Sequence, residues 1–393
     1  LGVGHVLDGS VRRAGTRVRV SAQLVDATTG FEIWSDRFDR PLDDAFAIQD
    51  EVAQAIAAAL SATLLAGGGA LARDRVSGEA YEAYLRARFA LNQRTERTLI
   101  AAAADFRLAI SLEPSLAVAH AGLAEAQLLL GVYGAVAPAT ALPAARAAAE
   151  QALAVDPALG VAHAVLGSVR ALYDRDWPAA EDAFRRALAI DPRHPTVSQW
   201  HAMHCLLPQG RFDEARGAVA RARQLDPLAS VLAASEAVVL HFAGDLEAAV
   251  AVLRDTLGRD PTFGLAHFFL GAALRDAGAL DAAEAAYRDA IVLASRSPEM
   301  LCGLGVVLAR RGDERGARAV LGELRAAASS RYVAPTLFAQ LYAALGDLDA
   351  ADVALGEARA LHDPELGFLG VRPSYRALHG RPAFEALRLE LRR

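Results

Sequence analysis

The sequence has no lysine, two cysteines and no dense cluster of catalytic motifs, and each scarcity excludes a class of function. Without lysine there is no Gly-Lys-Ser/Thr phosphate loop, and Gly2-Val3-Gly4 and Gly303-Leu304-Gly305 lack the third glycine of a dinucleotide loop. Cys205 and Cys302 lie almost a hundred residues apart, each in a predicted helix, which favours buried apolar side chains over a disulfide. No Gly-x-Ser-x-Gly nucleophile elbow occurs. We therefore predict no catalytic residue and no cofactor.

An excess of basic charge is also missing. The chain has 41 basic and 47 acidic residues, a net charge of −6 and a pI near 6.0, which argues against general nucleic-acid binding. The most apolar window, residues 52–72, is rich in alanine but carries Gln54, Ser61 and Thr63. It favours an amphipathic helix followed by a glycine linker over a membrane span. No secretory signal precedes the first strand pattern, at residues 3–11, so we expect the sequence to begin inside a domain.

What the chain has in abundance is residues that favour helices, and a regular punctuation of them. Apolar residues make up 53% of the chain, alanine is very common and every basic residue is arginine, which predicts a mainly α-helical protein. Glycines recur every 34 residues, each followed five residues later by an alanine: Gly210, Gly244, Gly278, Gly312 and Gly346. Acidic residues followed by proline recur at nearly the same interval: Glu113-Pro114, Asp156-Pro157, Asp191-Pro192, Asp226-Pro227 and Asp260-Pro261.

These two marks predict the two turns of a helix-turn-helix unit, because glycine can end a helix in the left-handed conformation and proline cannot continue one. In residues 264–296, Leu270, Leu274, Ala283, Tyr287 and Ala290 fall on helical spacing, with small residues where the two helices approach. This arrangement resembles the tetratricopeptide repeat. We count about eight units, beginning near residues 83, 117, 160, 196, 230, 264, 298 and 332, with a loop insertion from Tyr133 to Pro143. A right-handed α-solenoid is the predicted fold.

The first part of the chain has a different pattern. Residues 16–26 alternate between apolar and polar side chains, and turn signals separate them from strands predicted near 4–12 and 31–38. A helix is predicted after Asp44, with Ile48, Val52, Ile56, Leu60 and Leu64 in one stripe. The run LGVGHVLDGSVRRAGTRVRVSAQLVDATTGFEIWSDRFDR resembles the second half of the TolB-amino-terminal-like domain. In bacteria that domain often precedes tetratricopeptide arrays, and its relatives carry an upstream cyclase, kinase or winged-helix domain.

The predicted organisation is therefore a partial α+β domain at 1–66, a linker and helix start at 67–82, repeats at 83–366 and a capping segment at 367–393. In the cap, Phe384, Leu387 and Leu391 are expected to cover the last apolar face of the array.

Histidines give the only metal-like pattern. His201, His204 and Cys205 share one predicted helix and suit Zn²⁺, but the sequence nominates no further ligand, so no metal site is predicted. His120, His163 and His267 occupy the same position of three different repeats, which places them too far apart for one active site.

The tetratricopeptide resemblance implies that the first helix of each unit lines a concave groove. In repeats four to six this nominates a partner groove of aromatic and polar residues: Trp200, His204, Leu207, His241, Phe242, Phe268 and Arg275. The alternative is that Trp200 and Phe268 are core residues. We expect a non-catalytic scaffold that binds a protein or peptide, as the sensory or assembly part of a larger bacterial signalling protein. The alternative is a component of an envelope-associated assembly related to TolB-like proteins.

Overall fold

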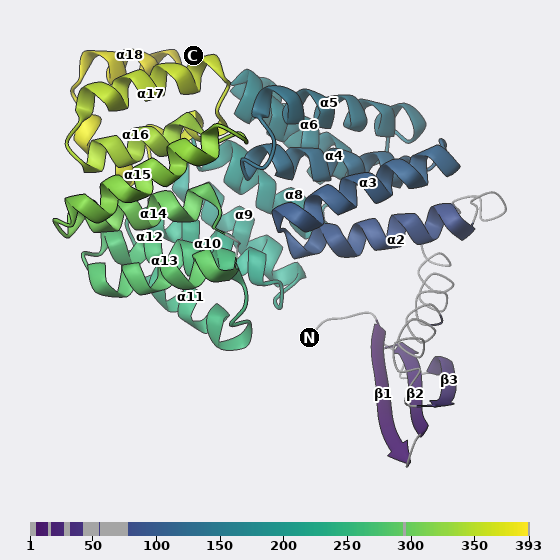
Figure 1. The fold of residues 1–393 in the computed structure, drawn as a ribbon. Helices are drawn as coiled ribbons and strands as arrows, with labels where there is room; N and C mark the ends of the chain where they lie inside the picture. Colours follow the sequence, from purple (N-terminus) through teal and green to yellow (C-terminus); the bar gives the residue numbers. More distant parts are fainter. Residues whose placement is uncertain are drawn as a thin grey trace. The chain divides into compact units, whose positions relative to one another are not determined.

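A computed structural model of the protein describes residues 5–14, 17–26, 32–41, 55, 78–293 and 296–391. The chain forms two compact units, Leu1–Val76 and Ser77–Arg393, each described by itself below (Figure 1). The glycine linker and the helix expected after Asp44 lie outside the described residues, apart from Ala55, which is helical. Among the described residues no helix combines the length and the apolar character needed to cross a membrane.

The first unit contains a three-stranded antiparallel sheet. Its strands are β1 (His5–Ala14), β2 (Arg17–Asp26) and β3 (Glu32–Pro41), joined in sequence order with β2 in the middle. The predicted alternation holds in β2, where Ala22 and Leu24 are buried and the intervening Ser21 and Gln23 are partly exposed. Tight turns between strands of matched length give this meander its register, with Ser10 opposite Ser21.

The second unit is an array of helix pairs, which confirms the predicted α-solenoid. Within residues 78–391 the pairs are α2 (Gly78–Gln93) and α3 (Glu96–Leu112), α4 (Ala117–Val132) and α5 (Pro138–Val155), α6 (Gly160–Val169) and α7 (Trp177–Ile190), α8 (Pro195–Trp200) and α9 (Phe212–Leu225), α10 (Ser230–Phe242) and α11 (Leu246–Arg259), α12 (Gly264–Asp276) and α13 (Leu280–Leu293), α14 (Pro298–Arg310) and α15 (Glu314–Ala328), and α16 (Pro335–Ala344) and α17 (Leu348–Ala360). Two π-helical stretches, η2 (Arg170–Asp174) and η3 (His201–Leu206), extend α6 and α8.

The turn inside each pair has the chemistry that the glycine spacing predicts. The five glycines have φ between 73° and 91°, a conformation that a side chain would strain. In three pairs the next residue but one or two begins the second helix with an aspartate cap: Asp245, Asp313 and Asp347 each accept a hydrogen bond from a backbone N–H three residues later. Gly380, a further 34 residues after Gly346, has φ of 82° and belongs to the same series.

Within a pair, a glycine of the first helix receives an aromatic ring of the second. A methyl group on Gly271 would lie 2.8 Å from Cδ2 of Tyr287, and one on Gly167 would lie 2.9 Å from Phe184. Tyr287 and Phe184 are almost completely buried. The close approach predicted for small residues at 271 and 283 is therefore confirmed.

Two segments differ from the expectation. The insertion of the second repeat is a loop over residues 133–137 only, because Pro138 begins α5 at a position where a missing N–H costs nothing. After α17 the chain forms two 3-10 turns, η4 (Pro364–Phe368) and η5 (Pro373–Leu378), and then α18 (Pro382–Glu390). Phe384, Leu387 and Leu391 are buried against this end of the array.

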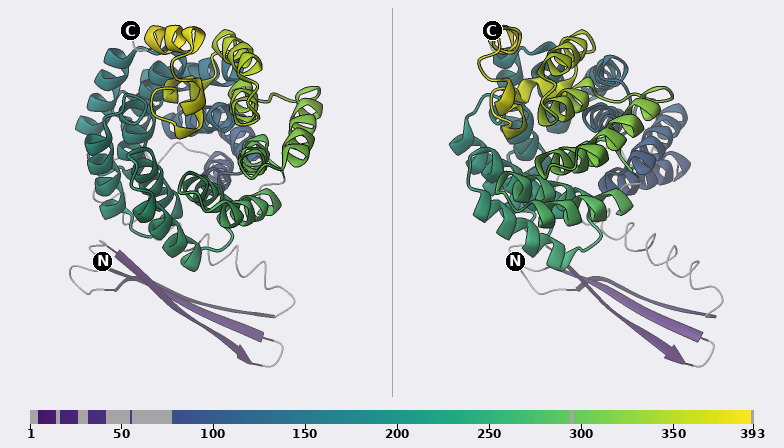
Figure 2. Two further views of the ribbon diagram at one scale, coloured as in Figure 1. Left: turned by 90° about the vertical axis from the view of Figure 1, so that its left-hand side faces the viewer. Right: turned by 60° about the vertical axis from the view of Figure 1, so that its left-hand side comes forward.

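The array curves with its first helices inward. Extended packing joins neighbouring first helices, such as α4 with α6, α10 with α12 and α14 with α16, whereas neighbouring second helices share no contact of that extent. The curvature brings distant repeats together: Arg331 pairs with Glu96 at 2.8 Å, and the loop at Gly134 lies against Glu299 of α14. Figure 2 shows the helix pairs around a ring-like curve, with the C-terminal residues in yellow reaching its inner side.

Candidate functional site on the inner face

The inner face of the array carries a stretch of the chain's own backbone. We call residues His362–Tyr375 the C-terminal segment; it is built from short 3-10 turns and does not continue the helix pairing. It lies across the first helices of repeats far away in sequence. Tyr173 of η2 stacks on His362 with ring centroids 4.5 Å apart, and Phe242 of α10 meets Phe368 edge-on at 6.0 Å. The inner face is thus able to hold an irregular peptide.

Charge and hydrogen bonds hold both ends of this segment. The carboxylate of Asp363 accepts hydrogen bonds from the backbone N–H and the hydroxyl of Thr336, at 3.2 and 2.6 Å. Burial raises the pKa of Asp363 to about 6 in spite of these bonds. At the other end, Ser374 donates to Oε1 of Gln340 at 3.0 Å, and the Arg372 guanidinium lies 5.4 Å from the ring centre of Phe242. Both contacts fall on first helices.

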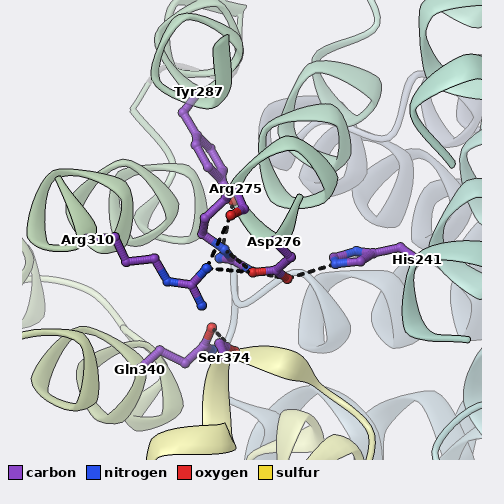
Figure 3. Close-up of polar contacts among 7 residues, drawn as sticks. All are labelled: His241, Arg275, Asp276, Tyr287, Arg310, Gln340 and Ser374. Carbon is purple, nitrogen blue, oxygen red and sulfur yellow. Dashed lines mark hydrogen bonds and ion pairs between the residues drawn. The ribbon is translucent and has the colours of Figure 1, made fainter. Parts of the chain in front are cut away.

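Beside the segment lies a polar group that we call the inner cluster: His241, Arg275, Asp276 and Arg310 (Figure 3). Arg275 donates from Nε and Nη2 to the two carboxylate oxygens of Asp276, both at 2.9 Å. His241 contacts Oδ2 of Asp276 at 2.8 Å, and Nη1 of Arg310 reaches Oδ1 at 3.0 Å. One carboxylate therefore joins the last turns of α10, α12 and α14.

The electrostatics of the inner cluster are set by Asp276. Burial by itself would raise the pKa of Asp276, but hydrogen bonds from His241 and Arg275 hold that pKa well below its usual range. The carboxylate is ionised at neutral pH and compensates one guanidinium. The side chains of Arg275 and Asp276 are each 5% exposed, whereas that of Arg310 is 36% exposed. Arg310 is the member of the cluster that a partner can reach.

The seven residues nominated for a partner groove lie in different environments. Trp200 and Leu207 are at most 1% exposed and belong to the core, which for Trp200 is the alternative that the sequence left open. His204 is buried and contacts the hydroxyl of Ser168 through Nδ1 at 2.9 Å. Burial lowers the pKa of His204 to about 3, so its ring is neutral. None of these three is available to a partner in this conformation.

The other four nominated residues stand at or beside the inner face. His241 and Arg275 are members of the inner cluster, and Phe242 packs against the C-terminal segment. Phe268 is partly buried and meets Tyr287 at 5.8 Å between ring centroids. The structure therefore brings together His241, Phe242 and Arg275, while Phe268 lies mainly against its own repeat.

The remaining histidine candidates separate. His120, His163 and His267 each contact the backbone carbonyl of the proline six residues earlier, at 2.9, 3.3 and 3.0 Å, so their shared position serves the turn of each repeat. His204 points away from His201 and Cys205, which instead face Glu181 of α7. Burial raises the pKa of Cys205 to about 12, so the free thiol is not a nucleophile at neutral pH.

Sequence reasoning missed Asp276 and Arg310, although a signal for them exists. Phe242, Asp276 and Arg310 are spaced by 34 residues, so they occupy one position of three successive repeats. Following that position along the array would have nominated all three together. The C-terminal segment has no such signal, because its irregular turns have no period to follow.

Comparison with known proteins follows the geometry. No protein-family model matches the chain. Over 125 residues, 31% of this chain, it is 42% identical to the protein named "Putative adenylate cyclase 3" of Rhizobium meliloti (strain 1021). The match covers 21% of that protein, so the chain corresponds to about a fifth of the length of this relative.

Solved structures resemble the array at low sequence identity. IFIT1 in complex with Gppp-AAAA has a TM-score of 0.50 and 15% identity, covering 67% of this chain and 68% of that one. Yeast Tom70 has a TM-score of 0.47 and 17% identity over 82% and 67%, and a tetratricopeptide repeat protein from Parabacteroides merdae has 0.45 and 10% over 71% and 100%. The likeness concerns the fold, which is a tetratricopeptide-like α-solenoid.

Proposed function

We propose that this chain is a non-catalytic scaffold that binds segments of partner proteins on the inner face of its array. The observation that carries the proposal is the C-terminal segment: an irregular stretch with exposed backbone turns already rests there on Tyr173, Phe242 and Gln340. Its anchors combine an aromatic contact, a buried carboxylate and side-chain hydrogen bonds, which is how such arrays hold peptides. A partner segment would use the same chemistry on the neighbouring, uncovered part of the face.

Charge indicates which kind of segment fits. The inner cluster has two guanidinium groups, on Arg275 and Arg310, and one carboxylate, on Asp276, while His241 beside that carboxylate adds no negative charge. One positive charge is left uncompensated, and it resides on the accessible Arg310. A carboxylate of the partner, from an acidic side chain or a free C-terminus, would complete this pair with charge-assisted hydrogen bonds.

The first prediction uses two adjacent arginines. Arg310 points to the inner cluster, whereas Arg311 pairs with Glu284 on the second helix of the preceding repeat. Peptides would be selected from a random displayed library on the full chain, and their affinities measured by calorimetry. We expect the selected peptides to carry carboxylates, and Arg310→Gln to weaken them at least tenfold, since a bond to a charged group contributes about 1.5–3 kcal/mol.

Arg311→Gln is the matched control and should leave the affinity unchanged. Equal losses in both variants would mean that overall charge, and not the inner face, governs binding. A library that yields no binders, together with tight binding of a single-stranded RNA oligonucleotide, would contradict a protein partner and favour nucleic acid.

The setting in which the scaffold works is a further part of the proposal. We infer that the array serves as the sensory or assembly part of a signalling protein, and the local similarity to the Rhizobium relative supports this. An envelope-associated assembly is the alternative, and only the TolB-like wording of residues 1–40 favours it. Sequencing the gene upstream of the codon for Leu1 distinguishes the two, because a catalytic domain supports the first and a signal peptide supports the second.

A further inference from the structure

Three side chains with different ligand atoms converge between repeats three and four. Glu181 comes from α7, while His201 and Cys205 come from η3, where the wide π-helical turn places residues four apart on one face. One ligand atom from each of the three lies within 4.8 Å of the others. Among the described residues, this is the group of histidine, cysteine and carboxylate side chains placed closely enough to share an ion.

The separations match those expected around one tetrahedral zinc ion. Zinc lies about 2.0 Å from a histidine nitrogen or a carboxylate oxygen and about 2.3 Å from a thiolate. Tetrahedral angles then place nitrogen and oxygen about 3.3 Å apart, and sulfur and oxygen about 3.5 Å apart. In the structure Nε2 of His201 lies 3.3 Å from Oε1 of Glu181, and Sγ of Cys205 lies 3.4 Å from Oε2.

The imidazole of His201 has no other use in the described structure. Both of its ring nitrogens are buried and neither has a hydrogen-bond partner, although Nε2 is close to Glu181. The 3.3 Å separation therefore brings charge near the ring without the alignment of a hydrogen bond. Buried polar atoms are nearly always satisfied, so a lone pair left in this position points to a missing ligand.

The local charge favours a cation when the thiol is deprotonated. Glu181 and Glu214 are both paired with Arg211, through contacts of 3.0 and 2.6 Å, which leaves one negative charge uncompensated. A divalent ion bound with a thiolate would cancel that charge. Arg211 would keep Glu214, to which it donates two hydrogen bonds, and release Glu181.

We propose that Glu181, His201 and Cys205 form a zinc site that joins the second helix of repeat three to the first helix of repeat four. Glu181 is about one-third exposed, so the fourth coordination position faces solvent. The site would act as a structural clamp across one inter-repeat boundary. It does not depend on the inner face or on Arg310.

Calorimetric titration of the chelator-treated full chain with Zn²⁺ tests the proposal, with Co²⁺ as a spectroscopic probe for a thiolate ligand. We expect one ion per chain, a sulfur-to-cobalt charge-transfer band, and at least a tenfold loss of affinity in Cys205→Ser and Glu181→Gln. Cys302→Ser is the matched control, since that buried thiol contacts only the carbonyl of Leu337, and it should bind as the parent does.

Arg211→Gln gives a result that misfolding cannot mimic. Removing the competing guanidinium should tighten Zn²⁺ binding severalfold. Absence of stoichiometric binding by the parent, or equal affinities for the parent and Cys205→Ser, would overturn the proposal. Circular-dichroism melting of each metal-free variant establishes that the proteins compared are folded.

Discussion

At the scale of single residues, two buried aspartates of the inner face have opposite electrostatics for a simple reason. Asp276 is surrounded by the cationic Arg275 and by His241, whose hydrogen bonds keep its pKa low. Asp363 is equally buried but accepts from the neutral Thr336, so burial dominates and raises its pKa to about 6. The first carboxylate belongs to the cluster that we propose for a partner, and the second anchors the C-terminal segment.

The raised pKa of Asp363 predicts a pH dependence. In the unfolded chain the pKa of an aspartate is about 3.9, so between pH 4 and 6 the folded state binds more protons and stability falls as pH rises. Asp363 should therefore add about 1 kcal/mol to the unfolding free energy at pH 5 relative to pH 7. Urea denaturation of the parent and Asp363→Asn at both pH values measures this, because other titrating groups cancel in the difference. A difference between the two proteins that does not change with pH would contradict it.

The sequence could identify some of these residues and not others. Tyr287 and Gly271 follow from helical spacing, because their contact lies inside one repeat and its partners are close in sequence. Trp200 and Leu207 share the spacing of groove residues but are buried, since the π-helical turn of η3 changes which side of the helix faces inward. A local pattern cannot show such a change in helix geometry.

At the scale of elements, punctuation determines the helix pairs and small residues determine how closely the helices pack. Gly303 of α14 is a packing position, not part of a phosphate loop: a methyl group there would lie 2.1 Å from Cε1 of Tyr287 in the preceding repeat. Gly322 of α15 has nothing within 4 Å of the same added atom and is exposed. The two glycines thus differ only in what surrounds them.

This pair gives a matched prediction. Gly303→Ala should destabilise the protein by about 1–3 kcal/mol, since the buried Tyr287 must move to admit the methyl group. Gly322→Ala should instead stabilise it by about 0.5–1 kcal/mol, because alanine has a lower entropy cost in a helix. Thermal and urea unfolding of both variants decide the signs. Two substitutions with the same sign would mean that packing at Gly303 is not the controlling factor.

The helix pairs were predictable because glycine, proline and alanine mark their limits locally. Pro143 shows the limit of that reading: it suggested the end of a loop but lies inside α5, whose first turn begins at Pro138. The C-terminal segment was predicted only as a cap, because its docking depends on contacts with residues far away in sequence, such as Phe242 and Gln340.

At the scale of the array, contacts between distant repeats are unusual for a solenoid, in which each repeat normally touches its neighbours alone. Two kinds of contact join the ends of the curve. The Arg331–Glu96 pair is exposed and contributes about 1 kcal/mol at most. The C-terminal segment buries Phe368 against Phe242, and this apolar contact is the stronger of the two.

We therefore predict that Phe368→Ala lowers the free energy of unfolding by about 3–5 kcal/mol and loosens the curve of the array. Small-angle scattering should show a larger radius of gyration, and urea unfolding should become less cooperative. Arg331→Ala, the control for the exposed pair, should leave both nearly unchanged. The reverse ranking would mean that surface charge, and not the C-terminal segment, sets the curvature.

The central claim is that the inner face of this α-solenoid binds segments of partner proteins. Hydrogen–deuterium exchange of the full chain, with and without a library-selected peptide, tests it most directly. The account predicts added protection in the last turns of α10, α12 and α14, where His241, Asp276 and Arg310 meet. Protection confined to second helices such as α11, α13 and α15, with the inner turns unchanged, would contradict it.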